Sequence, residues 1–449
     1  MRLEKYAEGM EFDFLNLLSV DLDGNLRSVT MPKKYVKAKD FRQKIGFDAS
    51  NYGYAKVTDS DMITIPDKDT AFIEEREEFR ILHMFGDVFT SAGETFDQYP
   101  RNVVRRTRDH LRSKGIADDV KMLVELEYYA FDSVDYASDW PLSFFRVASE
   151  EGIGEGYNTK PRFGLHGGYH KLPPEDRCMD FRNRSVHLME EVGIAVKYHH
   201  HEVAAAQLEI ELDFMDMAHA ADSVCLAKWI IRSLADEMDM KVTFMPKPIY
   251  KMPGSGMHVH QFPERGGKSI FVGDELYGLS KEALSYTAGL LEHSLTGSLL
   301  AFSNPSTNSY RRLVPGFEAP ISATFAKGSR GAAVRVPGYL DKDEVRIEYR
   351  TGDASANIYY MLSAMVLAGI DGIERGADPV ALGFNNPDAD PSRVFPLNLI
   401  SVMEGLKRDN EYLKPVFPQK LIDIWIGKKN AEASYVYNAP TPQEYELYF

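Results

Sequence analysis

Cysteine and long apolar segments are both scarce in this sequence. The two cysteines among 449 residues, Cys178 and Cys225, are too few for a disulfide framework and fit a reducing cytoplasm. The most apolar segment, residues 358–370, is too short to span a bilayer and is followed at once by Asp371. The N-terminal segment is charged and has no apolar core, so we expect no signal peptide. These absences predict a cytoplasmic protein that crosses no membrane.

Positive charge is also in short supply. The 52 lysines and arginines are outnumbered by 67 acidic residues, so the net charge is −15. This balance argues against nucleic acid as the main partner, because binding a phosphate backbone needs a basic surface. It does not exclude small anions, which a few local arginines can hold. With 44% hydrophobic and 27% charged residues, the composition is that of a globular protein long enough for more than one domain.

Two common nucleotide-binding motifs are missing as well. Residues 266–269 (GGKS) have Phe262 where the leading glycine of a Walker A loop should stand. Residues 152–154 (GIG) are followed by Tyr157 at the position of the third glycine of a dinucleotide-binding fingerprint. If ATP binds to this protein, it therefore binds without either phosphate loop.

The first ninety residues show the alternation of β-strands. A hairpin is predicted around Asp23 and Gly24, with its second strand ending at Pro32. Residues 62–67 and 79–89 predict further strands, the acidic run 74–78 an exposed turn, and the basic run 33–44 the solvated face of a short helix. We expect a small β-rich domain over residues 1–93, before a helix that begins at Pro100.

The remainder, residues 94–449, alternates strands and helices without a short repeat, which predicts an α+β catalytic domain. The strands are expected at 121–132, 194–203, 208–214, 241–244 and 257–262, and the helices at 177–192, 218–238, 281–300, 355–375 and 397–408.

Charged residues gather between residues 304 and 350 without a helical period, in a stretch interrupted by prolines, which predicts loops that carry function. They are Arg312, Glu318, Arg330, Arg335, Arg346, Glu348 and Arg350. The planar fork of arginine suits carboxylate and phosphate oxygens, so this stretch favours a site for a polyanion and an acid. The alternative is a surface ion-pair network.

Acidic side chains also occur in spaced pairs. Glu125 and Glu127 are one residue apart on a predicted strand, so they face the same side, either towards a cation or towards solvent. Glu202 and Glu209 lie on either side of a turn of small residues that a strand pair could close. His258 and His260 repeat the one-residue spacing.

With Glu348, these residues form a candidate metal set: Glu125, Glu127, Glu202, Glu209, His258 and Glu348. Five carboxylates and one imidazole favour Mg²⁺ or Mn²⁺ over zinc, and six ligands suit two ions rather than one. Consecutive strand residues alternate faces, so we expect His199, His200 and His201 to be mostly structural.

The joint order and spacing of TFMPKP, GSGMHVH, NPSTNSYRRLVPG and RIEYR resemble the type I glutamine synthetases of bacteria and archaea. The resemblance runs from the FDAS segment near residue 48 to the C-terminal ELYF. It implies a small N-terminal β-grasp domain followed by a catalytic domain with a curved antiparallel sheet. It also implies a dodecamer of two stacked hexamer rings, with each active site at a subunit boundary.

The resemblance assigns roles by position. Glu127, Glu202 and Glu209 resemble the ligands of one metal ion, and Glu125, His258 and Glu348 those of a second. Gly254, Arg312 and Arg350 match the glutamate site, and His260, Arg330, Arg335 and Arg346 the sites that contact ATP phosphates or the transferred phosphoryl group. Asp48, Tyr169 and Glu202 match the ammonium pocket, with Asp48 as the base, and Glu318 the flap that closes over it.

The implied reaction joins ammonia to the γ-carboxylate of glutamate, with ATP as co-substrate and Mg²⁺ or Mn²⁺ as cofactor. The alternative is a γ-glutamyl ligase for another amine, such as a polyamine or methylamine. A third hypothesis is a non-catalytic relative, but such a protein would have no reason to keep six ligands whose clustered charges are unfavourable without a metal ion. Departures from the family pattern at Asn51, Ala206, Pro253 and around Arg330 remove no expected metal ligand. The segment 383–396 offers no counterpart to the tyrosine that is adenylylated in some relatives, so we do not expect that regulation.

Overall fold

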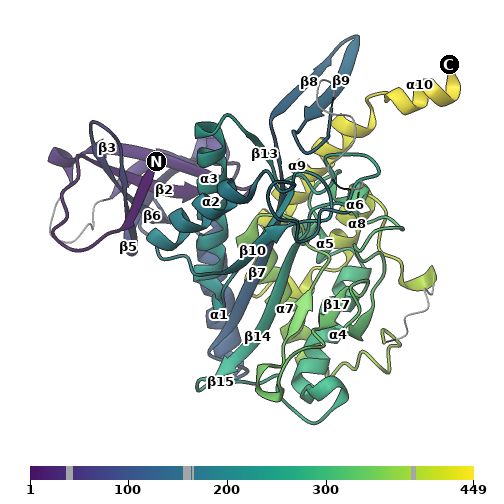
Figure 1. Ribbon diagram of the computed structural model, residues 1–449. Helices are drawn as coiled ribbons and strands as arrows, with labels where there is room; N and C mark the ends of the chain where they lie inside the picture. Colours follow the sequence, from purple (N-terminus) through teal and green to yellow (C-terminus); the bar gives the residue numbers. More distant parts are fainter. Residues whose placement is uncertain (37–43, 155–162, 164–165, 386–390) are drawn as a thin grey trace.

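The computed structural model describes residues 1–36, 44–154, 163, 166–385 and 391–449. A small sheet lies at one end of the molecule, beside the helices α1 (Pro100–Ser113), α2 (Met179–Glu191) and α3 (Met217–Glu237), and a larger sheet with further helices forms the rest (Figure 1). This arrangement confirms the α+β class, with a β-grasp domain and a larger domain of sheet and helices. The predicted helix over 33–44 lies mostly outside the described residues.

The smaller sheet has the order β1-β5-β6-β2-β3, with β4 paired to β5. Its strands are β1 (Arg2–Lys5), β2 (Phe14–Val20), β3 (Leu26–Pro32), β4 (Ile45–Asp48), β5 (Asp61–Glu75) and β6 (Arg80–Thr90). All pairs are antiparallel except β2 with β6. The domain boundary near residue 93 stays a prediction.

The hairpin predicted around Gly24 is confirmed, because β2 and β3 pair with Val20 opposite Leu26. Gly24 adopts a φ of +86°, a value that glycine reaches without steric cost. The Asp21 carboxylate holds the turn by accepting hydrogen bonds from the backbone N–H groups of Asp23 and Asn25, at 3.1 and 2.8 Å. Hydrogen bonds within the turn itself therefore fix the register of the β2–β3 pair.

The expectation of an exposed acidic turn at 74–78 is wrong for its first residue. Glu74 belongs to β5, is only 2% exposed, and pairs with His83 at 3.0 Å and with Arg76. The tight turn begins later, where the Arg76 N–H donates to the carbonyl of Phe79. Glu74 is buried because its strand alternation places it beside His83, on the neighbouring strand β6.

The larger sheet has the order β10-β11-β7-β14-β18-β17-β16, with β12 and β13 added to β7 and β15 to β14. Its strands are β7 (Asp119–Phe131), β10 (Val196–His201), β11 (Gln207–Leu212), β12 (Met215–Asp216), β13 (Lys241–Thr243), β14 (Met257–Arg265), β15 (Lys268–Ser269), β16 (Phe325–Lys327), β17 (Val334–Val336) and β18 (Ile347–Tyr349). The sheet is antiparallel, as expected, except for the parallel pair β16–β17. Residues 304–350, which we expected to be loops, contain three of these short strands.

The helices cover the larger sheet and support the smaller one (Figure 1). They are α1 (Pro100–Ser113), α2 (Met179–Glu191), α3 (Met217–Glu237), α4 (Lys281–Leu295), α5 (Leu300–Ser303), α6 (Ser309–Arg312), α7 (Ile358–Arg375), α8 (Leu399–Arg408), α9 (Gln419–Tyr437) and α10 (Pro442–Tyr448). The helix expected over 281–300 ends at Leu295, and α9 and α10 were not predicted. In the described part of the chain, none of these helices combines the length and the apolar character needed to span a membrane.

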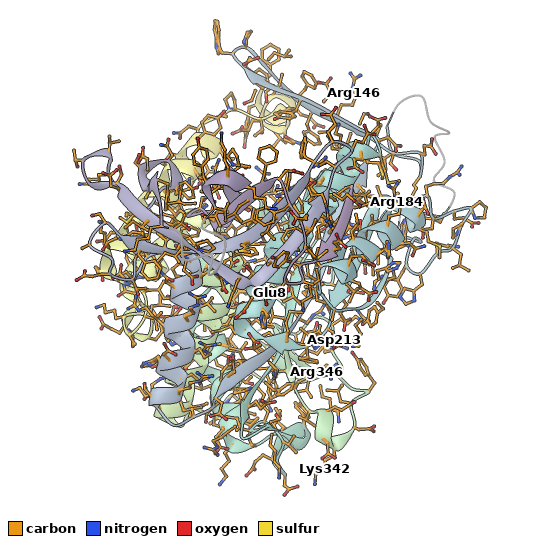
Figure 2. All side chains as sticks on the ribbon, turned by 90° about the vertical axis from the view of Figure 1, so that its left-hand side faces the viewer. Glu8, Arg146, Arg184, Asp213, Lys342 and Arg346 are labelled. Atoms are coloured by element: carbon orange, nitrogen blue, oxygen red, sulfur yellow. The ribbon has the colours of Figure 1, made fainter. Side chains whose placement is uncertain are left out.

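A hairpin of β8 (Ser133–Asp139) and β9 (Leu142–Ala148) projects from the body. Figure 2 labels Arg146 on this hairpin, at the edge of the molecule. Trp140 at its tip is 95% exposed, and Tyr136 and Phe145 are 74% and 64% exposed. Exposed aromatic side chains on a projecting element are typical of an interaction surface.

Candidate active site

The register of five strand pairs aligns ionisable side chains across the larger sheet. The aligned pairs are His200 with Glu209, Glu209 with Glu127, Glu125 with His258, His260 with Glu348, and Arg335 with Glu348. Residues two apart on a strand share a face, so Glu125 and Glu127 point to the same side, as do His258 and His260. One face of the sheet therefore carries most of the acidic and basic candidates.

This face opens into a cavity of about 370 Å³. Twelve of the residues that the sequence singled out line the cavity: Glu125, Glu127, Tyr169, Glu202, Glu209, Gly254, His258, Arg312, Glu318, Arg330, Arg335 and Arg350. Most of them come from β7, β10–β11, β14 and the charged stretch, and Tyr169 and Gly254 come from connecting segments, so residues more than two hundred positions apart meet in one place. A surface ion-pair network would not have produced this concave arrangement.

Three further candidates do not line the cavity but are buried close to residues that do. Glu348 is fully buried, and its neighbour across the sheet, His260, is 1% exposed. Arg346 is 6% exposed, its Nε is 3.4 Å from His260 Nδ1, and its guanidinium covers the ring of Phe214. These side chains can support the ones that face the cavity.

One side of the cavity has an excess of negative charge. Glu202 and Glu209 are closely packed, 12% and 9% exposed, with Glu127 beside them. Burial, together with repulsion from neighbouring carboxylates, raises the pKa of Glu202 and of Glu209 well above the usual range. His200 is the basic side chain nearest to both, with ring nitrogens 3.7 Å from Glu202 and 3.6 Å from Glu209. A divalent cation would offset this charge.

The other side is already balanced. Burial disfavours the charge of Glu125, but hydrogen bonds with His258 at 2.7 Å and His260 at 2.8 Å outweigh it and lower the pKa of Glu125 well below its usual range. Glu348 accepts from Arg335 at 2.6 Å and Arg350 at 2.5 Å. Against the effect of burial, attraction to His260 and Arg350 lowers the pKa of Glu348.

Potential ligand atoms cluster on both sides. One cluster contains Glu125, His260 and Glu348, a second contains His200, Glu202 and Glu209, and a third contains Glu125, Glu209 and Glu211. The first two differ from the expected sets, since His260 takes the place of His258 and His200 that of Glu127. The two expected ligands that these clusters leave out, His258 and Glu127, lie close to each other, since His258 Nε2 is 3.7 Å from the Glu127 carboxylate.

The glutamate-site candidates are packed against backbone. Arg312 is 3% exposed and donates to the carbonyls of Thr351 at 2.7 Å and Arg350 at 3.1 Å. Gly254 has no room for a side chain, because a Cβ atom would lie 2.7 Å from Arg312 Cγ and 2.6 Å from the carbonyl of Pro246. Pro253, which also lines the cavity, accepts a hydrogen bond at its carbonyl from the Tyr129 hydroxyl, at 2.7 Å.

Asp48 is the candidate that lies elsewhere. It ends β4 in the smaller sheet and is not among the residues that line the cavity of its own chain. Its carboxylate accepts hydrogen bonds from the Ser50 N–H and from the Asn51 amide, both at 2.9 Å. The contacts with Ser50 are the main reason why the pKa of Asp48 is lowered, so this exposed carboxylate is ionised at neutral pH.

Two residues close to these carboxylates were not identified from the sequence: His200, which lines the cavity, and Glu211, which does not. His200 faces the carboxylates, whereas His199 contacts Arg182 and His201 contacts the buried Glu151, so of the three histidines expected to be mostly structural only His200 lines the cavity. Glu211 is 2% exposed and pairs with Lys197 at 2.7 Å. Its one-residue spacing from Glu209 repeats that of Glu125 and Glu127 and could have indicated it.

The sequence comparisons agree with this architecture. Residues 11–91 match the profile "Glutamine synthetase, beta-Grasp domain", and residues 97–448 match "Glutamine synthetase, catalytic domain". The two matched regions together define a class of two-domain enzymes, with a β-grasp domain followed by a catalytic domain. Glutamine synthetases of Vibrio alginolyticus and Escherichia coli (strain K12) are each 35% identical to this chain, over 98% of it and 97% of their own length. That of Azotobacter vinelandii is 36% identical over 97% of both chains. The chain belongs to the glutamine synthetase family.

Solved structures share the fold. The Plasmodium falciparum glutamine synthetase superposes with a TM-score of 0.90 over 100% of both chains, at 23% identity. A ligand-free GmaS structure gives a TM-score of 0.79 at 25% identity, over 97% of this chain and 96% of that one. The fold, the family and the enzymatic class are thus established together.

Proposed function

We propose that this enzyme ligates ammonia to the γ-carboxylate of L-glutamate at the expense of ATP, through γ-glutamyl phosphate. The observation that carries the proposal is the cavity in which unneutralised carboxylates on β7 and β10–β11 face arginines of the 304–350 stretch. Such a cavity suits a reaction in which two anions, a carboxylate and a nucleoside triphosphate, must be brought together. Family membership independently supports the same chemistry.

The metal sites that we propose comprise Glu127, Glu202 and Glu209 for one ion and Glu125, His258 and Glu348 for a second. The raised pKa of Glu202 and of Glu209 supports this assignment, because a cation in their midst would relieve their repulsion. Oxygen-rich ligands suit Mg²⁺ or Mn²⁺. When bound, these ions would neutralise phosphate charge and orient the triphosphate.

The basic residues would bind the two anionic substrates. The amino acid would be held by Arg312, Arg350 and the backbone of Gly254, and the transferred phosphoryl group would be stabilised by Arg330 and Arg335. His260 and Arg346, which do not line the cavity, would hold the phosphate-binding part of the site in position. Phosphoryl transfer to the γ-carboxylate then converts a poor leaving oxygen into phosphate.

Ammonium would bind beside Tyr169 and Glu202, where Asp48 takes a proton and releases ammonia to attack the acyl carbon. Glu318, on an exposed loop at the cavity mouth, would shield the acyl phosphate from water. Because Asp48 lies off the cavity of its own chain, we assign the base at each site to a neighbouring subunit.

That assignment requires a homo-oligomer, and we propose the dodecamer that the family resemblance implies. Two exposed apolar projections support it. One is the hairpin that carries Trp140, and the other is α10 at the C-terminus, where Tyr448 is 82% exposed (Figure 1). Light scattering on the purified protein tests this, and a monomer that is fully active would contradict a shared active site.

A second candidate, ligation of a larger amine, is favoured by an aromatic cluster at the acceptor side. The Tyr169 ring stacks on His170 at 4.0 Å and approaches His200 at 5.2 Å, beside Glu202. Aromatic faces attract alkylammonium groups through cation–π contacts. Pro253, in place of the usual asparagine, also alters the substrate side.

One assay separates the candidates. Phosphate release and amide formation are measured with ATP, Mg²⁺ and glutamate, with ammonium compared against methylamine, putrescine and spermidine at equal concentrations. We expect the highest kcat/KM with ammonium. Amide formation from an amine and none from ammonium would reject the first proposal in favour of the second.

A further inference from the structure

Lys247 lies in the TFMPKP segment, to which the reaction above assigns no role. It follows β13 and is 8% exposed, an unusual setting for a lysine. Its backbone is clamped by Asn308, whose Oδ1 accepts from the Lys247 N–H at 2.7 Å and whose Nδ2 donates to the Lys247 carbonyl at 3.1 Å. Since Asn308 immediately precedes α6, which ends in Arg312, the lysine is anchored to the glutamate site.

The side chain of Lys247 joins two further segments. Its ammonium donates to the carbonyl of Met252, in the loop that leads to Gly254, and lies 3.5 Å from the centroid of the Phe317 ring. Burial, followed by repulsion from Arg312, lowers the pKa of Lys247 to about 8. Phe317 precedes Glu318 directly, so the ammonium contacts the loop that would close the cavity.

The loop around Phe317 has few other attachments. No backbone hydrogen bond joins residues 315–319 to another segment of the described chain. The second ring contact of Phe317 in that part of the chain is with His166, edge-on at 6.4 Å. Glu318 itself is exposed. Ala319 packs against the hydrophobic core at the end of the loop, so it is the Phe317 ring, rather than the whole loop, whose position depends on the cation–π contact with Lys247.

We infer that Lys247 is a positioning residue, which holds Phe317 and thereby keeps Glu318 over the reacting carbon. The inference rests on the proposed function. When the loop is displaced, water attacks the γ-carbonyl carbon of the acyl phosphate and the carbon–oxygen bond to the phosphoryl group breaks. Glutamate and inorganic phosphate are then released, so ATP is hydrolysed without an amide being formed.

The test is the ratio of phosphate released to amide formed. The wild-type enzyme should give a ratio close to one. Lys247→Met removes the charge at similar length, Phe317→Leu removes the ring, and each should raise the ratio roughly threefold or more. The matched controls Lys247→Arg and Phe317→Tyr keep a cation and a ring and should stay near one. The double variant Lys247→Met/Phe317→Leu should be no more uncoupled than either single variant, since both act through one contact.

Two outcomes would overturn the inference. One is a ratio of phosphate to amide near one in both Lys247→Met and Phe317→Leu while Glu318→Ala is uncoupled. Glu318 would then shield the acyl phosphate without the contact between Lys247 and Phe317. The other is additive uncoupling in the double variant. If Lys247→Met does not fold, Phe317→Leu on the half-buried loop decides alone. If the wild-type enzyme forms no amide from ammonium, the proposed function fails instead, and the ratio is measured with the amine that it accepts.

Discussion

His200 lies directly opposite Glu209 across the antiparallel pair β10–β11, and its Nε2 is 3.6 Å from the Glu209 carboxylate. The same ring faces Glu202 through Nδ1, at 3.7 Å. An imidazole held between two carboxylates of a proposed metal site either binds the ion or orients the groups that do. We therefore propose that His200 belongs to the site, together with the residues that the family pattern names.

The first prediction concerns His200 and metal affinity. His200→Asn should weaken Mn²⁺ binding roughly tenfold, because the carboxylates lose their neighbouring imidazole. Titration of the enzyme with Mn²⁺, followed by electron paramagnetic resonance, measures this without turnover. His199→Asn is the matched control, since His199 contacts Arg182 instead. Equal affinities in both variants would show that His200 is structural after all.

A second prediction uses backbone strain at the turn between Glu202 and Glu209. Ala206 adopts a φ of +62°, which is costly for any residue with a Cβ atom. Ala206→Gly should stabilise the protein by about 0.5 to 1 kcal/mol, measured by urea denaturation. Ala205, beside it, has no positive φ, so Ala205→Gly should destabilise instead. A loss of stability in Ala206→Gly would contradict the strain argument.

The third prediction concerns the junction between the two sheets. Arg101 is 6% exposed and donates to Asp222 at 2.9 Å, to Asp87 at 2.6 Å and to Asp67 at 2.9 Å. Arg101→Met leaves three carboxylates without their shared partner and should cost about 3 kcal/mol or more. Arg105→Met, which removes a side chain 34% exposed, should cost less than about 1 kcal/mol. Comparable losses in the two variants would argue against a special role for the buried arginine.

A fourth prediction is a pH-dependent contribution to stability. His293 Nδ1 lies 2.8 Å from Asp409 and Nε2 lies 2.9 Å from Asp371. Burial opposes the charge, but these two hydrogen bonds outweigh it and raise the pKa of His293. A raised folded-state pKa stabilises the protein fully below the unfolded pKa of about 6.5, and this stabilisation is lost as pH rises through the folded-state value.

His293→Gln should therefore cost about 1 to 2 kcal/mol more at pH 6 than at pH 9, as seen in urea unfolding at both pH values. His187→Gln is the control, because the His187 side chain is 74% exposed and 4.0 Å from its acidic neighbour. A cost that does not vary with pH would mean that His293 contributes through packing against Tyr412 alone.

Local rules account for what could be predicted from the sequence. The shared face of Glu125 and Glu127, that of His258 and His260, and the hairpin at Gly24 all follow from strand alternation and turn chemistry, which depend on neighbouring residues. The motif order was enough to predict the family, and both domain types with it. The departure at Ala206 was visible in the sequence, but its positive φ was not.

The tertiary structure alone decided which of these faces meet. His200 joined the carboxylates because β10 pairs with β11 in one register, and a shift of one residue would have presented His199 or His201 instead. Glu74 was buried by its neighbour on β6, Asp48 was placed away from its own cavity, and Lys247 was brought under Phe317 from seventy residues away. Register and packing depend on contacts between distant segments, which leave no periodic trace in the sequence.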